Sequence, residues 1–325
     1  MKINKNIILI IINIFFLQCS KNILIINNNS LNAYGDMSTL NLLTWNVENF
    51  PKNNLTTVEY LNSAIDSLVV DIIALQEIES QTKLNQLTEQ LGDEWINFRD
   101  FGSSNYGQLA YLINTDEITD IVPPFSLLNE SVECEIYMGS IDSHPCQNST
   151  DYDIEYNFAW RMPYVLEFTY ENQIFYIINV HFKCCNSSGD EKFRRYDASN
   201  YLDAYINDNY PNNNVIIMGD FNGNIDEAVN IQQVQHDVFE SFLGPSYMFA
   251  DESIYQGDSE LWSYPTWPSH IDHIVITDEI FNSSLIEYNT NTVLVEDLYD
   301  DGFSEYNDYI SDHRPVLINL NLETD

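Results

Sequence analysis

Short apolar stretches alternate with amphipathic stretches along most of the chain. A strand pattern at residues 39–46 precedes a helical pattern at 56–69, and a strand pattern at 71–78 precedes a helical pattern at 81–91. Apolar residues at every second position predict half-buried strands, whereas apolar residues spaced by three and four predict helices with one buried face. This alternation predicts an α/β fold.

The rest of the chain continues the same pattern. A helical pattern spans Lys192 to Ile206, and the strand patterns lie at residues 107–114, 161–170, 173–182, 213–220, 270–277 and 315–320. Between residues 124 and 158 the pattern weakens into an acidic stretch without Lys or Arg, which predicts a loop insertion. No repeat and no internal linker interrupts these elements, so residues 39–325 are predicted to form one domain.

The first 38 residues differ from this domain. Residues 1–19 combine two lysines with an apolar run of eleven residues, Ile7 to Leu17, which is too short to cross a bilayer core of about 30 Å. They predict a signal peptide and export, and the Asn-rich residues 20–38 predict a linker. Cys19 stands where a lipoprotein signal places its lipidated cysteine, but Gln18 fits that signal poorly. A membrane tether and free secretion therefore both remain open.

Four further cysteines follow the leader, and an even number in an exported chain predicts disulfide bonds, with three possible pairings. They are Cys134, Cys146, Cys184 and Cys185. Zinc is the weaker alternative, because the chain has no CxxC pair.

The charge is strongly negative. Twelve Lys and Arg face fifty Asp and Glu, which gives a formal charge of −38. At long range such a chain repels nucleic acids and anionic membranes, so any anionic substrate must be captured locally. Half of the basic residues cluster near the polar motifs described next and predict a small positive spot rather than a long groove: Arg161, Lys183, Lys192, Arg194, Arg195 and Arg314.

Polar side chains recur where predicted strands end. They include Asn46, Gln76, Glu77, His181, Asp220, Asn222, His270, Asp272 and His273, and the segment "SDHRP" at 311–315 precedes the last strand. Taken singly, each is explained by turn formation or helix capping. Strand ends along one edge of a sheet meet in space, however, and α/β folds bind their ligands there. Together these residues predict one site.

Seven motifs in order carry a family resemblance. They are "TWNVENF", "LQEIE", "RMP", "NVHF", "GDFNGN", "HIDHI" and "SDHRP". The chain resembles the endonuclease/exonuclease/phosphatase superfamily, the DNase I-like metal-dependent phosphoesterases, from about Leu40 to Leu320. The resemblance implies a four-layer α/β sandwich, with two packed mixed sheets flanked by helices. It also implies hydrolysis of phosphodiester bonds by in-line attack of water.

The resemblance further assigns roles to individual residues. It implies a site for Mg²⁺, or Mn²⁺, at Asn46, Glu77 and Asp312, whose hard oxygen ligands suit these ions. It implies catalytic roles for His313 oriented by Asp272, for Asp220 and Asn222 around the nucleophile, for His181 near the leaving group, and for Arg161 as a phosphate clamp. Either Asp220 or His313 is implied as the general base, and Arg314 is expected to face solvent.

Two departures from the nuclease pattern weaken a literal DNase interpretation. Met162 stands where nucleases carry a glutamate, and Gln108 falls near the position of the glutamate that partners the second histidine. A neutral Gln supports an imidazolium less than a carboxylate does. The sequence therefore predicts an exported phosphodiesterase, with nucleic acid as the first substrate class. Sphingomyelin, phospholipid or sugar phosphate is the enzymatic alternative, and a catalytically silent binding module is the remaining one.

Overall fold

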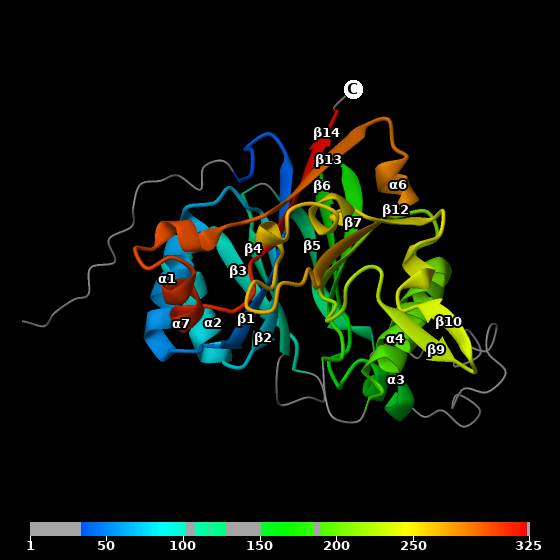
Figure 1. Cartoon of the computed structure of the whole chain (residues 1–325). Coiled ribbons are helices and arrows are strands. Elements are labelled where there is room, and N and C mark those ends of the chain that lie inside the picture. The colour runs from blue at the N-terminus through cyan, green and yellow to red at the C-terminus, as the bar shows by residue number, and fades with distance from the viewer. Residues whose placement is uncertain (1–33, 102–107, 117, 128–150, 185–188, 324–325) are drawn as a thin grey trace, which may run out of the picture.

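Two six-stranded β-sheets packed face to face form the centre of the molecule (Figure 1). The computed structural model describes residues 34–101, 108–116, 118–127, 151–184 and 189–323. The predicted signal peptide, most of the linker and most of the insertion lie outside these residues. Within the described part, no helix is both long and apolar enough to span a membrane.

The first sheet contains both ends of the described domain. Its strands, in spatial order, are β13 (Ile286–Thr292), β14 (Val316–Leu322), β1 (Leu40–Phe50), β2 (Ile72–Ile78), β4 (Gln108–Asn114) and β3 (Trp95–Arg99). Only β1 and β2 run parallel, and all other neighbours are antiparallel. The sheet is therefore mixed.

The second sheet repeats this arrangement with the middle of the chain. Its strands, in spatial order, are β11 (Tyr247–Phe249), β12 (Asp272–Thr277), β8 (Asn214–Asp220), β7 (Gln173–His181), β6 (Tyr164–Tyr170) and β5 (Thr119–Ser126). Here β7 and β8 form the parallel pair. Each sheet thus has one parallel pair near its centre.

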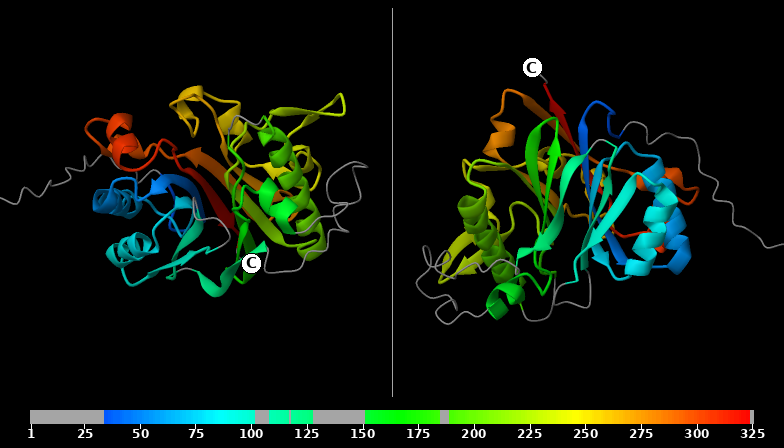
Figure 2. Two further views of the ribbon diagram at one scale, coloured as in Figure 1. Left: turned by 90° about the horizontal axis from the view of Figure 1, so that it is seen from below. Right: turned by 180° about the vertical axis from the view of Figure 1, so that it is seen from behind.

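Helices cover the outer face of each sheet, which gives four layers (Figure 2). The first sheet is covered by α1 (Asn54–Asp66), α2 (Gln81–Leu91) and α7 (Phe303–Tyr309), and the second by α4 (Glu191–Asn209). Along β1, Leu40 and Leu42 point into the core between the sheets, whereas Leu43 and Trp45 point to the helices. Strands buried on both faces are apolar almost throughout, as the sequence pattern had indicated.

Shorter elements connect these layers. The helices are α3 (Asp151–Asn157), α5 (Glu252–Tyr255) and α6 (Asp278–Phe281), and the 3₁₀ turns are η5 (Glu240–Phe242), η6 (Ser259–Leu261) and η7 (Val295–Leu298). A separate hairpin consists of β9 (Ala228–Ile231) and β10 (Val234–Asp237).

The four-layer sandwich expected from the sequence is confirmed, and every predicted strand and helix is present, with ends shifted by a few residues. The strands that the pattern did not predict include all four sheet edges, β13, β3, β11 and β5. An edge strand has a neighbour on one side only, so it need not be a long apolar run: β13 carries several polar residues, β5 contains two prolines, and β11 is only three residues long.

Candidate active site

The strand register brings the polar motifs together at one end of the two sheets. His181 at the end of β7 pairs with Asp220 at the end of β8, and Asp220 pairs with Asp272 at the start of β12. In the first sheet, Asn46 pairs with Gln76, next to Glu77. Because parallel strands end at the same edge, residues far apart in the chain become neighbours.

A cleft of about 600 Å³ opens at this edge. The predicted site residues that line it are Glu77, His181, Asp220, Asn222, Asp312 and His313. Asn46 and Asp272 are buried behind its wall and contact these residues. Eight of the nine predicted residues therefore line the cleft or contact its lining, and Arg161 lies behind them.

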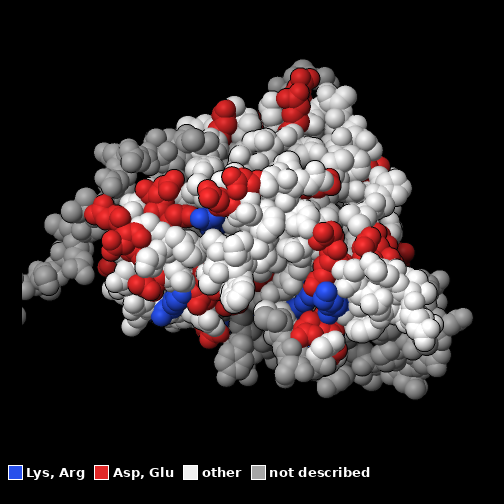
Figure 3. Space-filling view, in the orientation of Figure 1, with Lys and Arg blue, Asp and Glu red and all other residues white. Residues whose placement is uncertain are grey.

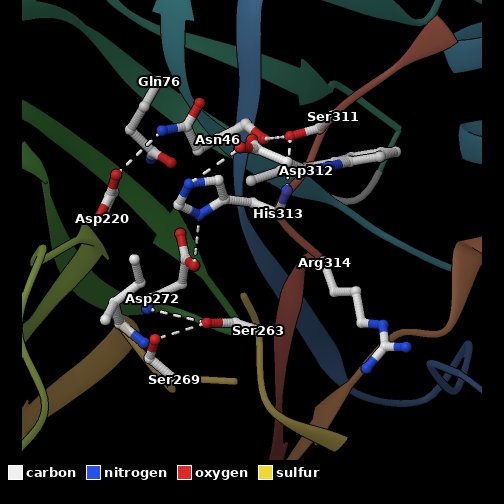
Figure 4. A network of polar contacts seen from close by, with 12 residues as sticks. Asn46, Gln76, Asp220, Ser263, Ser269, Asp272, Ser311, Asp312, His313 and Arg314 are labelled. Carbon is white, nitrogen blue, oxygen red and sulfur yellow. Dashed lines mark hydrogen bonds and ion pairs between the residues drawn. The ribbon is translucent and has the colours of Figure 1, made fainter. Parts of the chain in front are cut away.

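His313 is held from two sides. Its Nδ1 lies 2.8 Å from Oδ2 of the buried Asp272 (Figure 4), and its backbone N–H donates to Oγ of Ser311. Burial opposes the charged form of the imidazole, but the charge and hydrogen bond of Asp272 outweigh burial and raise the pKa of His313 to about 10. His313 is therefore an imidazolium at neutral pH, with Nε2 left to face a substrate.

Asp220 lies beside His313 and is almost fully buried. Its carboxylate accepts hydrogen bonds from Nδ2 of Asn46, at 3.0 Å, and from the backbone N–H of Asn222, at 2.9 Å. Burial raises the pKa of Asp220 to about 7, although the charge of His313 opposes this shift. A carboxylate with a pKa near 7 is suited to accept a proton at neutral pH.

His181 differs from His313 in its protonation. Burial, followed by the charge of Arg161, holds the pKa of His181 well below its usual range, so the ring is neutral. Its Nε2 lies 3.3 Å from Oδ2 of Asp220, and its buried Nδ1 has no hydrogen-bond partner among the described residues. Glu77 lies 3.9 Å from the same Nε2, so two carboxylates lie near the ring, but burial and the charge of Arg161 keep it neutral.

Oxygen donors gather beside Asp220 and His313 and could hold a divalent cation. Glu77 and Asp312 present carboxylates to the cleft, and Glu48 joins them there. Burial, together with the charge of Asp312, raises the pKa of Glu48 despite its ion pair with Lys52. Crowded carboxylates of this kind fit a hard cation such as Mg²⁺.

Asn46 occupies a different place from the one expected. Its Oδ1 accepts the backbone N–H of Glu48 at 3.0 Å, and its Nδ2 donates to both Glu77 and Asp220. The amide nitrogen of Asn46 thus links Glu77 to Asp220. Of the three predicted cation ligands, only Glu77 and Asp312 present oxygen atoms to the cleft.

Two arginines are placed differently from the sequence-based expectation. Arg161 is not in the lining of the cleft: its Nη2 donates to the carbonyl of Phe182 at 3.0 Å, and from behind the wall its charge acts on His181, Asp220 and Glu77. Arg314 does not face open solvent: its guanidinium binds Glu296 and the carbonyl of Glu260, and it points away from His313 (Figure 4). Guanidinium groups bind whichever acceptors the fold brings near, and strand patterns do not predict these acceptors.

The predicted positive spot is largely neutralised by acidic partners. Arg195 binds Glu227 at 2.6 Å, and Lys192 lies 3.4 Å from the same carboxylate. Arg194 stacks on the ring of Tyr156. Figure 3 shows the few Lys and Arg atoms on one face as small groups beside Asp and Glu. The cleft therefore offers a short cationic contact rather than a track for a long duplex.

Sequence reasoning missed several residues that shape the site. Glu48 follows Asn46 in the same motif. Its backbone and that of Asn49 have a left-handed conformation, as does that of Glu77 on β2, and such conformations cluster at functional sites. Ser311 donates its hydroxyl to the carbonyl of Asn46 at 2.6 Å and so ties β1 to the segment before β14. Its position two residues before His313 could have indicated a role in the site.

The predicted disulfides fall mainly outside the described residues. Cys134, Cys146 and Cys185 are not described, and Cys184 lines the cleft. The disulfides remain a prediction.

Comparison with known proteins supplies a family and a fold. The model of the Endonuclease/Exonuclease/phosphatase family matches residues 43–313. No curated protein matches the chain by sequence.

Solved structures with a similar fold come from several organisms. A humanized D. rerio TDP2 is 16% identical with a TM-score of 0.60, covering 87% of this chain and 99% of that one. The Xenopus laevis APE2 catalytic domain is 15% identical with a TM-score of 0.56, covering 87% and 92%. An endonuclease/exonuclease/phosphatase from Bacteroides vulgatus is 15% identical with a TM-score of 0.54, covering 88% and 99%. At these identities the likeness shows the fold alone.

Proposed function

This chain belongs to the Endonuclease/Exonuclease/phosphatase family of metal-dependent phosphodiester hydrolases, and from that premise we propose that it is an exported, Mg²⁺-dependent endonuclease. The observation that carries the proposal is the contrast between two neighbouring groups in the cleft. The His313 ring, oriented by the Asp272 carboxylate, is cationic, and Asp220 beside it has a raised pKa of about 7. Such a pair supplies positive charge to a phosphate and a base to water.

We assign the general base to Asp220 rather than to His313. A protonated His313 cannot take a proton at neutral pH, whereas its Nε2–H can donate to a phosphoryl oxygen that gains charge in the transition state. Asp220 takes the proton from the attacking water, and Asn222 and Asn46 hold its two oxygens in place. As the bond from phosphorus to the leaving oxygen breaks, a neutral His181 donates a hydrogen bond from Nε2, its ring nitrogen near Asp220, to that oxygen, which takes its proton from solvent water.

The cation would be held by Glu77 and Asp312, with Glu48 beside them. When bound, it supplies charge neutralisation at the phosphoryl oxygens. Glu77 also accepts the backbone N–H of Asn49 at 2.9 Å, which fixes its carboxylate at the mouth of the cleft.

The charge of Glu77 should set the Mg²⁺ requirement. Glu77→Gln keeps the size of the side chain and removes one carboxylate, so the Mg²⁺ concentration for half-maximal activity should rise at least about tenfold, or about 1.4 kcal/mol. Titration of activity with Mg²⁺ measures this. Glu79→Gln, an exposed carboxylate two residues further on, is the control and should leave the requirement unchanged. An unaltered requirement in Glu77→Gln would place the cation elsewhere.

The pH profile should follow the two cleft groups. Asp220 must be ionised to accept a proton, so kcat/KM should rise as the pH increases through about 7. His313 must stay protonated, so kcat/KM should fall as the pH passes about 10. A rate profile with bis-p-nitrophenyl phosphate tests this. A profile that falls between pH 7 and 9 would contradict the assignment of charges.

Nucleic acid is the proposed substrate class, and a feature beside the cleft supports it. Tyr264 and Ser269, which line the cleft, close a short loop through two backbone hydrogen bonds. Trp267 on this loop is 77% exposed. An exposed indole beside a phosphate site offers a stacking surface for a base, worth about 1–3 kcal/mol. The mostly paired cations favour short or single-stranded segments over long duplexes.

A substrate panel tests the proposed function. Plasmid DNA, single-stranded DNA, RNA, sphingomyelin and bis-p-nitrophenyl phosphate would each be incubated with Mg²⁺ and with EDTA. We expect cleavage of nucleic acid with Mg²⁺ and none with EDTA. Cleavage of sphingomyelin alone would support the lipid alternative, and no turnover of any substrate would support a silent binding module.

Export rests on the leader pattern of residues 1–19. The N-terminus of protein recovered from cells should begin after the apolar run, and a retained Met1 would contradict export through this leader.

A further inference from the structure

Three ionisable side chains that the proposed reaction does not use meet beneath the cleft. Asp251, His270 and His273 are each 0% exposed. Oδ2 of Asp251 lies 2.9 Å from Nε2 of His270 and 2.6 Å from Nδ1 of His273. Burying ionisable groups is costly unless they are paired and hydrogen-bonded, so an arrangement of this kind requires an explanation.

Every other polar atom of this cluster also has a partner. Oδ1 of Asp251 accepts the backbone N–H of Ile274 at 2.8 Å, and Nδ1 of His270 accepts that of Ser263 at 3.3 Å. Nε2 of His273 lies 3.0 Å from the carbonyl oxygen of Gly223. The rings of Phe221 and Phe249 pack edge-on against His273 and help to close the cluster from water.

These partners fix the protons. Since the backbone N–H of Ser263 can only donate, Nδ1 of His270 is an acceptor and its single proton is on Nε2, which makes the ring neutral. Burial likewise lowers the pKa of His270. Both nitrogens of His273 face acceptors, a carboxylate and a carbonyl, and only an imidazolium satisfies both.

Asp251 balances that charge. Burial by itself would raise its pKa, but the charge of His273 and the hydrogen bonds of both histidines outweigh burial and hold the pKa below its usual range. The cluster thus contains one anion, one cation and one neutral ring.

A metal ion fits these three side chains poorly, although their ligand atoms lie within 4.8 Å of one another. A metal on Nε2 of His270 would require the proton on Nδ1, where it would face the N–H of Ser263. Metal-binding histidines normally donate their second N–H to an acceptor. The hydrogen bonds of the two histidines therefore favour protons, rather than a metal ion, between the rings and Asp251.

The cluster touches the active site at two points. Gly223 directly follows Asn222 in the loop that comes after Asp220, and its carbonyl is held by His273. Ser263, held by His270, accepts the backbone N–H of Asp272 on its Oγ at 3.1 Å (Figure 4). The same three buried groups therefore restrain the loop after the proposed base and the backbone of Asp272, whose carboxylate orients His313.

We propose that Asp251, His270 and His273 form a buried, charge-balanced positioning cluster that sets the relative placement of Asp220 and Asp272. The three are positioning residues, because none reaches the cleft. This proposal rests on the proposed function in naming the reaction that the cluster supports. The positions of the protons and the contacts of the cluster do not depend on which substrate the protein cleaves.

The first test is a double-mutant cycle with bis-p-nitrophenyl phosphate. Asp251→Asn keeps the shape but offers its amide to N–H donors, so kcat should fall at least about tenfold while KM stays within about threefold, since substrate contacts are intact. His273→Gln should have a similar effect. If the pair acts as one unit, the double variant should be no slower than the worse single variant. Additive losses, or a kcat in Asp251→Asn within twofold of the wild type, would overturn the proposal.

Two controls separate positioning from general loss of stability. Leu84→Ala removes a fully buried side chain on α2, which packs on the first sheet. It should lower the melting temperature while leaving kcat of the folded protein within twofold. His236→Gln alters a histidine that pairs with Glu240 on the outer hairpin, and it should change neither quantity. A kcat loss in Leu84→Ala equal to that in Asp251→Asn would reduce the cluster to a stability role.

The second test needs no variant and no turnover. In wild-type protein labelled with ¹⁵N-histidine, His273 should carry a proton on each ring nitrogen, and His270 should be a neutral ring with its proton on Nε2. Metal analysis of the same sample should find no transition metal at one equivalent. A neutral His273, or stoichiometric zinc lost only on unfolding, would overturn the proposal. If the wild type cleaves no phosphodiester while these signals are found, the proposed function fails and the cluster stands.

Discussion

His313→Ala is expected to lower kcat by at least about a hundredfold while the protein remains folded. The imidazolium of His313 is the only cation whose orientation by a buried carboxylate, Asp272 at 2.8 Å, aims it into the described cleft. Loss of one preorganised donor to a phosphoryl oxygen typically costs a factor of about 10²–10³. Steady-state kinetics with the best substrate of the panel would measure the loss, and circular dichroism would confirm the fold.

His236→Ala is the matched control for this variant. His236 also contacts a carboxylate, that of Glu240, but it lies on the outer hairpin and is partly exposed. It should retain wild-type kcat. Near-normal turnover by His313→Ala would remove His313 from the chemical step and would leave the paired Asp272 without a catalytic explanation.

Asp220→Asn is expected to have an equal or larger effect, because it removes the proposed base at constant size. The substituted amide cannot accept a proton from water, so kcat should fall by at least about a hundredfold. It should also abolish the rise in kcat/KM near pH 7 that the ionisation of Asp220 produces. A pH–rate profile of the residual activity measures both consequences together.

Asp226→Asn is the control for the loss of one negative charge in the same loop, because Asp226 is exposed. It should leave both kcat and the pH profile unchanged. If Asp220→Asn keeps the acidic limb near pH 7 despite a lower kcat, another group is the base, and Asp220 serves only to hold the water.

The sequence by itself determined the central strands, the main helices and the chemical type of the site. Strands such as β1 and β8, buried on both faces, must be apolar along their length, so their pattern is legible without any structure. The same strands end in carboxylates, amides and histidines because a ligand site lies there, and the oxygen donors predicted a hard cation. These features depend on each segment alone.

Tertiary structure decided the features that depend on several segments at once. Arg161 and Arg314 are bound to acceptors on other elements, and Glu48 becomes a cleft residue only because it meets Asp312, 264 residues away. The choice between Asp220 and His313 as base required their burial and their neighbours, since desolvation and nearby charge shift a pKa and neither is encoded locally.

Asp251 is the clearest example of a residue whose role the sequence does not reveal. The motif "HIDHI" displays His270 and His273, but Asp251 lies 19 and 22 residues before them in a segment without a motif. Only the antiparallel packing of β11 against β12 brings the chain around to place its carboxylate between the two rings. A buried charge is stabilised by the geometry of its partners, and that geometry exists only after the chain has folded.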